Sequence, residues 1–211
     1  MSSTSGRAIT GNSVVLRFSR LCHRLSACIL GAFIFLHLGN HIAGLAGQEV
    51  HWAVQIKLRG IYQGWLEPLL LLACLFQIAT GLKLAWARRH LKGRALLQPL
   101  SGLYMGLFLS IHVSAVLMAR ASGINTDLAF AAAGLHAGLW IFFFAPYYGL
   151  AVLALGLHLS VPVSKHSQVG GLLLIGGSVT LAFLLVLLLS GSIAPLFIPP
   201  QLIQVFCDLG C

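Results

Sequence analysis

The chain has 211 residues, of which 58% are hydrophobic and only 8% are charged. This composition, with a mean hydropathy of +0.93, excludes a water-soluble globular domain and indicates an integral membrane protein. Thirteen Lys and Arg residues against four Asp and Glu residues give a formal net charge of +9. In a membrane protein such an excess reflects how basic residues are distributed across the bilayer, and we expect no nucleic-acid partner.

Five cysteines are scattered singly along the chain. Because no CxxC pair is present, neither a zinc ribbon nor a c-type haem attachment is indicated. Cys207 and Cys211 could form a disulfide only if the C-terminal tail lies in an oxidising compartment.

The N-terminal residues 1–18 are rich in Ser, Gly and Arg, and they predict a flexible tail. The apolar segments that follow are each near the ~20 residues needed to cross a ~30 Å hydrocarbon core. Because lipid offers no hydrogen-bond partners and barrel-type alternation is absent, we expect helices. The segments lie at about residues 25–46, 66–87, 101–120, 136–160 and 171–195. The sequence therefore predicts an all-α, five-helix transmembrane bundle over residues 19–195, followed by a tail over residues 196–211.

The ends of these expected helices differ in charge. Ten Lys and Arg residues precede the first helix or lie near the second-to-third and fourth-to-fifth connections, whereas the opposite loops carry three, together with all four acidic residues. The positive-inside rule therefore predicts that the N-terminus is inside and the C-terminus outside. We expect the protein to reside in a bacterial inner (cytoplasmic) membrane.

Two histidines, His37 and His112, interrupt apolar segments at matching depth. At a rise of ~1.5 Å per residue, His37 lies ~18 Å from the inner end of the first helix and His112 ~17 Å from the inner end of the third. An ionisable side chain in a membrane span costs at least ~2 kcal/mol unless it faces protein, cofactor or water. Two neutral imidazoles from different helices are a common ligand set for haem iron. The pair predicts a haem b site.

Other interpretations of the histidines stay open. A single histidine within a membrane is more often a polar contact between helices, so a haem-free assembly subunit of a larger complex is one alternative. A small-solute transporter is another, although neither repeated halves nor discontinuous helices are visible in the sequence. His41 and His136 fall near the outer face, and His51, His90 and His166 are expected in loops at the interface.

The residues CHRLSA at positions 22–27 resemble the HR-x-S signature that opens the first helix of one family of membrane anchors. These are the cytochrome b anchor subunits of succinate:quinone oxidoreductases and fumarate reductases. The five-helix layout, with His37, Gln77, His112 and His158 on successive helices, is similar to the single-chain members. In di-haem members, the first and third helices hold one haem, and the second and fourth hold the other.

The resemblance implies an outer-half haem at His37 and His112, with His158 as one ligand of an inner-half haem. Gln77 stands where that inner haem would need its second histidine. A neutral amide is a much poorer iron ligand than imidazole, so we expect one haem b per chain. His158 is then expected to act as a hydrogen-bond donor near the inner surface.

The resemblance also implies a quinone site and soluble partners. His23, Arg24 and Ser26 match the family's quinone-site residues, where cations and a hydroxyl can bind a quinone carbonyl as negative charge develops. Glu67, at the outer start of the second helix, could accept a proton from quinol. The implied function is a non-catalytic electron-transfer subunit that passes electrons between membrane quinone and a soluble dehydrogenase or reductase. Its expected partners are iron-sulfur and flavoprotein subunits on the inner face, because this chain has no nucleotide fingerprint or cysteine cluster.

Overall fold

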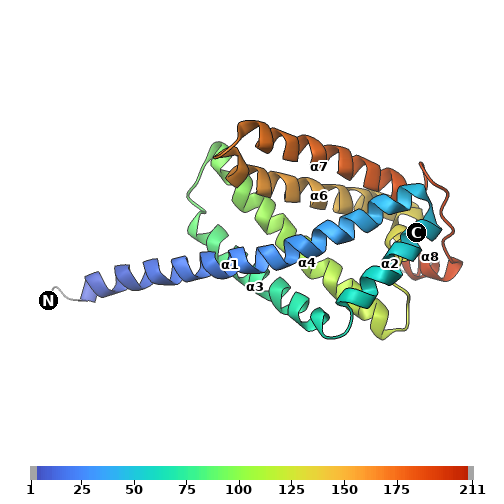
Figure 1. Ribbon diagram of the computed structural model, residues 1–211, viewed down its shortest axis with the longest axis horizontal. Coiled ribbons are helices and arrows are strands. Elements are labelled where there is room, and N and C mark those ends of the chain that lie inside the picture. The colour runs from blue at the N-terminus through green and yellow to red at the C-terminus, as the bar shows by residue number, and fades with distance from the viewer. Residues whose placement is uncertain (1–3, 209–211) are drawn as a thin grey trace.

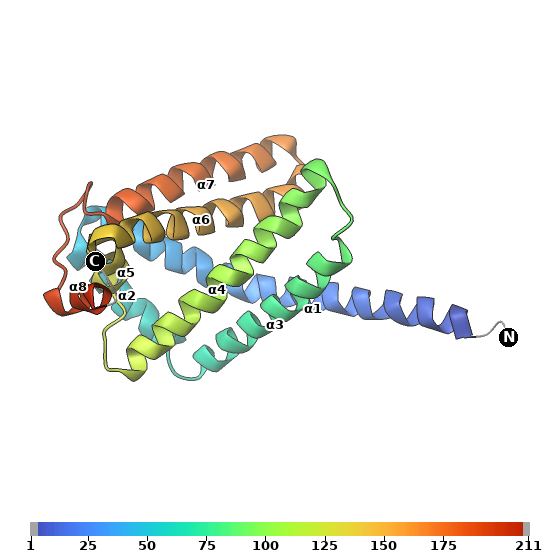
Figure 2. The same cartoon turned by 180° about the vertical axis from the view of Figure 1, so that it is seen from behind.

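A computed structural model describes residues 4–208, and the regular structure within that range is entirely helical. Five of its helices are long and apolar enough to cross a membrane. They are α1 (Thr4–Ala43), α3 (Leu66–Ala87), α4 (Leu97–Ala121), α6 (Ile141–Ser164) and α7 (Gln168–Leu189). Figures 1 and 2 show them running along one another as a bundle. The prediction of an all-α integral membrane protein with five spans is confirmed.

Three shorter helices gather at one end of this bundle, as Figure 2 shows. They are α2 (Gln48–Tyr62), α5 (Leu128–Ala133) and α8 (Pro200–Cys207). We call this the α2 end, and we call the opposite end, which carries the α3–α4 connection, the loop end. The segment 196–211, predicted as a tail, thus contains a helix, while Cys211 and its pairing with Cys207 lie outside the described residues.

Helix boundaries depart from the predicted segments where local signals outweigh hydropathy. α1 begins at Thr4, inside the segment predicted as a flexible tail, and its first part projects beyond the bundle (Figure 1). α7 ends at Leu189 and does not continue to residue 195. The reason is Gly191, whose φ of +72° is the left-handed conformation that commonly terminates a helix.

Close helix packing follows the chain around the bundle. α1 packs on α3, α3 on α4, α4 on α6, and α6 on α7. Within residues 4–208, neither α1–α4 nor α1–α6 has a comparably close backbone approach. α1 therefore faces α4 and α6 across an interior that side chains must bridge.

The tightest of these contacts joins α6 to α7. A Cβ atom on Gly156 would overlap the side chain of Ser178 and would lie 3.0 Å from the carbonyl oxygen of Leu174. A Cβ atom on Gly171 would likewise overlap Ser164. Small residues that let helix backbones approach closely are the usual means of packing helices in a membrane. The α6–α7 pair is the most closely packed in the bundle, and among the other long helices α4 packs against it, through α6.

Candidate functional site

His37 on α1 and His112 on α4 face each other across the bundle interior. Their ring centroids lie 6.0 Å apart, and the ring planes are inclined by 67°. Phe33 stacks on His37 at 5.7 Å, and Phe108 stacks on His112 at 5.1 Å. Among the described residues, no hydrogen bond is formed by the ring nitrogens of either histidine. The two rings are thus oriented by aromatic neighbours and leave their nitrogens available.

The spacing of these rings fits one metal ion held between them. An imidazole nitrogen binds a metal at about 2.0 Å, so two rings on opposite sides of one ion place their centroids about 6 Å apart. The observed separation is 6.0 Å. Two side-chain ligands suffice when the cofactor supplies the other donor atoms, as haem does. Unpaired polar groups at this depth are costly in lipid unless a bound group engages them, and His37 and His112 are the residues that could hold a haem here.

A second polar group continues from His37 toward the α2 end. His41 lies one turn further along α1, with its ring 4.9 Å from that of His37 and 5.4 Å from that of His51. Nε2 of His51 accepts a hydrogen bond from Asn40 Nδ2 at 3.0 Å. Several buried atoms here have no partner among the described residues: Asn40 Oδ1, His41 Nδ1, His51 Nδ1, Gln55 Oε1 and Arg59 Nε. A row of such atoms is suited to binding buried water.

His51 was predicted to be an interfacial loop residue, and that prediction is wrong. It lies on α2, and only 1% of its surface is exposed. His51 is buried because α2 folds back against the end of α1. The local sequence around His51 does not show this contact. Asn40, directly beside His41 in an otherwise apolar run, was the signal in the sequence that a polar partner was needed here.

We expect acid to destabilise the protein through His51. Burial lowers the pKa of His51 to about 4, with the charges of His37 and Arg59 adding to the effect and Asp127 opposing it. The unfolded chain, with an ordinary pKa of about 6.5, then binds the proton first, so stability is lost as pH falls from 6.5 toward 4. At about 1.4 kcal/mol per unit, the loss approaches about 3 kcal/mol. The melting temperature in detergent should fall between pH 6.5 and pH 4, and it should fall less in His51→Gln. Equal falls in the wild type and the variant would show that His51 is not the cause.

At the loop end, His23 and Ser26 on α1 join Gln77 and Thr80 on α3 in one network. His23 Nδ1 donates to Thr80 Oγ1 at 3.0 Å, and His23 Nε2 accepts from Gln77 Nε2 at 3.2 Å. The Ser26 hydroxyl donates to Gln77 Oε1 at 2.7 Å. Two of the four residues predicted for the quinone site, His23 and Ser26, are therefore brought together, whereas Arg24 is exposed on another face of α1. Thr80 was not identified from the sequence, since which α3 residues face α1 depends on how the helices pack.

His158 on α6 lies opposite His23, with ring centroids 6.4 Å apart and planes inclined by 65°. Its Nδ1 donates to the carbonyl oxygen of Gln98 at 3.0 Å, and Ser101 Oγ lies 3.4 Å from the same nitrogen. The spacing is similar to that of His37 and His112. The difference is that both ring nitrogens of His23 are engaged in hydrogen bonds.

Glu67 is separated from this network, at the α2 end of α3. It forms an ion pair with Arg120, near the end of α4, and both side chains are partly exposed. Arg120 also approaches Thr126 Oγ1, at 3.4 Å. This ion pair connects α3 and α4 at the membrane edge. The Glu67 carboxylate, which was predicted to accept a proton from quinol, is thus paired with Arg120.

Within residues 4–208, no group of three or more His, Cys, Asp or Glu side chains has the geometry to hold a metal ion. The polar features of the interior are thus the facing pair His37 and His112, the row of unpartnered buried polar atoms beside it, and the loop-end network. The chain matches no family model, no curated protein and no solved structure.

Proposed function

We propose that this protein is a membrane cytochrome in which His37 and His112 hold one b-type haem. The observation that carries the proposal is their 6.0 Å facing geometry, with no hydrogen bond to either ring within the described chain. When bound, haem supplies an iron that takes up and releases single electrons. The chain's own contribution is to position both imidazoles: Phe33 and Phe108 stack on the rings and limit their rotation.

The competing interpretation is a haem-free assembly subunit whose histidines make hydrogen bonds between helices. That description suits His23 and His158, whose nitrogens bond to groups on other helices. It does not suit His37 and His112, because an interhelical contact would use the ring nitrogens that these residues leave unbonded. The contrast between the two pairs favours the cytochrome.

We further propose that electrons pass between membrane quinone and soluble iron-sulfur and flavoprotein subunits. The loop-end network supports the quinone part, since only one N–H of the Gln77 amide is engaged there, by His23, and the other can donate to a quinone carbonyl. Arg24 would add positive charge from the adjacent exposed face. Glu67 stays outside this proposal, because its carboxylate is paired with Arg120.

We expect the loop end to face the inside of a bacterial inner membrane. Ten Lys and Arg residues precede the first span or lie in and beside the connections at this end, against three at the α2 end. A membrane-impermeant thiol label should therefore reach Arg89→Cys only from the inside, and a reporter fused after Cys211 should be active only outside. Finding the labelled cysteine and the C-terminal reporter on the same side of the membrane would contradict this topology.

A visible spectrum and a pyridine haemochrome assay of the purified protein test the proposed function. We expect a Soret band and one haem per chain. A His158→Ala variant should keep that haem, because His158 already donates to the Gln98 carbonyl and faces a fully bonded His23. Colourless protein from haem-replete cells would contradict the cytochrome. A ratio near two that drops to one in His158→Ala would instead place a second haem at the loop end.

A further inference from the structure

A seam of buried polar side chains lies where α2 packs against the end of α1. Among residues 4–208, the buried side-chain atoms that lack a hydrogen-bond partner all belong to it: Asn40 Oδ1, His41 Nδ1, His51 Nδ1, Gln55 Oε1 and Arg59 Nε. We call these residues the polar seam. His51, Gln55 and Arg59 follow one another at intervals of four on α2 and so share one face of that helix. Unpaired buried polar atoms are rare, and their concentration in one seam points to a common partner that the polypeptide does not supply.

The unpartnered atoms of the polar seam include both donors and acceptors. Nε2 of His51 accepts a hydrogen bond from Asn40 Nδ2 at 3.0 Å, so the ring proton sits on Nδ1 and makes that atom a donor. Nε of Arg59 is also a donor, whereas the side-chain oxygens of Asn40 and Gln55 are acceptors. An anion would satisfy only the donors, and a metal cation would satisfy only the acceptors. Water satisfies both, because a buried water molecule donates and accepts at once.

The polar seam extends from the surface of the α2 end to the interior of the bundle. At the surface, Arg59 donates to Asn125 Oδ1 at 2.8 Å, and Asn125 is exposed in the connection between α4 and α5. In the interior, the ring of His41 lies 4.9 Å from that of His37. His37 is roughly 14 Å along the helix from Ala46, the last residue of the first apolar span. Polar groups thus continue from an exposed residue into the depth of the membrane.

The charge at the mouth of the polar seam is balanced. Arg59 is linked to Asp127 through Asn125, whose Nδ2 donates to Asp127 Oδ2 at 3.2 Å. An arginine without a compensating charge would repel protons and other cations from a narrow polar path. Because the Asp127 carboxylate belongs to the same network, the mouth does not exclude a proton.

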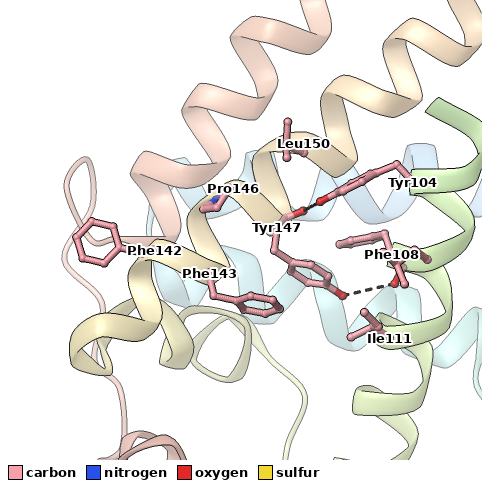
Figure 3. A pocket seen from close by; sticks show the side chains of 9 residues that line it. Tyr104, Phe108, Ile111, Phe142, Phe143, Pro146, Tyr147 and Leu150 are labelled. Atoms are coloured by element: carbon pink, nitrogen blue, oxygen red, sulfur yellow. Dashed lines mark hydrogen bonds between the residues drawn. The ribbon is translucent and has the colours of Figure 1, made fainter. Parts of the chain in front are cut away.

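The pocket between α4 and α6 does not offer water a comparable route (Figure 3). Its lining is aliphatic and aromatic, apart from the hydroxyls of Tyr104 and Tyr147. Both hydroxyls already donate to backbone carbonyls, that of Tyr147 at 3.0 Å and that of Phe108 at 3.4 Å. Leu107 on its rim is 58% exposed, so we expect lipid to cover this opening. The polar entrance to the interior is therefore at the α2 end.

We propose that the polar seam holds a connected chain of water molecules, which carries protons between the aqueous phase at the α2 end and the interior beside His37. In each step a water molecule accepts one proton and passes another to the next water along their hydrogen bond. The charge of the side chains stays unchanged, and His51 Nδ1 and Gln55 Oε1 keep the waters in line. The route itself is independent of the proposed function. Only its use, which is to offset charge that enters the interior, rests on that function.

Exchange of the His51 ring proton with water tests this route. Full-length protein with isotope-labelled histidine is placed in lipid bilayers, and solid-state NMR measures transfer from water to the imidazole N–H. His51→Gln identifies the His51 signal by its loss. In the wild type this proton should exchange rapidly, although only 1% of the His51 surface is exposed. Gln55→Leu removes an acceptor from the seam and should slow the exchange about tenfold, the effect of losing about 1.4 kcal/mol of water-binding free energy.

Gln63→Leu is the matched control, because it makes the same substitution at an exposed residue just after α2. It should exchange at the wild-type rate. Equal rates in folded Gln55→Leu and Gln63→Leu would overturn the proposal, and circular dichroism verifies the fold of each variant. The wild type decides the matter even if Gln55→Leu does not fold, since no detectable transfer from water to His51 would show a dry seam.

The visible spectrum of the same samples separates this proposal from the proposed function. Rapid exchange at His51 in a colourless protein would uphold the route and overturn the haem assignment. A haem-containing protein without exchange at His51 would do the reverse.

Discussion

Replacing His37 or His112 with Ala should abolish the low-spin haem spectrum while leaving the bundle folded. His37 and His112 would each hold the iron from one helix, so the loss of either ring would leave the haem with a single protein ligand. Neither ring makes a hydrogen bond within the described residues, so removal leaves no partner unsatisfied. The close helix packings, α1 on α3 and α4 on α6, do not depend on these side chains meeting. The Soret absorbance and the helical circular dichroism of each variant measure the two expectations together.

His41→Ala is the matched control for this experiment. His41 lies on the same helix one turn from His37, with ring centroids 4.9 Å apart, but its ring does not face His112 across the interior in the same way. The control should keep a bis-histidine spectrum, and added imidazole should partly restore the spectrum of the His37 and His112 variants by filling the vacated space. Loss of haem in His41→Ala with retention in His37→Ala would show that the wrong histidine is assigned.

Gly156→Leu should cause the largest loss of folding stability among the scaffold substitutions. The new Cβ would overlap Ser178 and meet the Leu174 backbone at 3.0 Å, so α6 and α7 would have to separate. Overpacking of this kind costs typically about 1–3 kcal/mol and sometimes more, a large fraction of the ~5–15 kcal/mol that stabilises a typical domain. Thermal unfolding in detergent, followed by circular dichroism, measures the effect.

Gly176→Leu on α7 provides the comparison, because a Cβ at Gly176 has no neighbour within 4 Å. It should unfold near the wild-type temperature, since leucine also has a better helix propensity than glycine. Equal melting temperatures for the Gly156 and Gly176 variants would mean that the α6–α7 contact is more adaptable than its geometry indicates.

Hydropathy located the spans because it responds directly to the thickness of the bilayer core. The second span was predicted at residues 66–87, and α3 is Leu66–Ala87. The matching depth of His37 and His112 could also be predicted, because a constant rise per residue converts position along a helix into depth. Depth cannot show whether two side chains meet, and the 6.0 Å contact required the packed bundle.

Features that depend on how a helix is rotated, or on where the chain folds back, could not be predicted from the sequence. Gln77 was placed by family resemblance at a haem ligand position, but the rotation of α3 against α1 brings it to His23 and Ser26. α2 carries many polar residues and no transmembrane signal, so its folding back over α1, which buries His51, could not be predicted. The pocket between α4 and α6 likewise combines residues about 40 positions apart, such as Phe108 and Tyr147.

Low-temperature electron paramagnetic resonance of the oxidised protein tests the haem assignment most directly. Two imidazole ligands would give a low-spin ferric signal, and rings that kept their 67° inclination on the iron would make that signal highly anisotropic. We predict one such low-spin species per chain in the wild type, converted to a high-spin signal or lost in His112→Ala. A wild-type protein with only a high-spin haem signal, or with a low-spin signal that His112→Ala leaves unchanged, would contradict a haem held by His37 and His112.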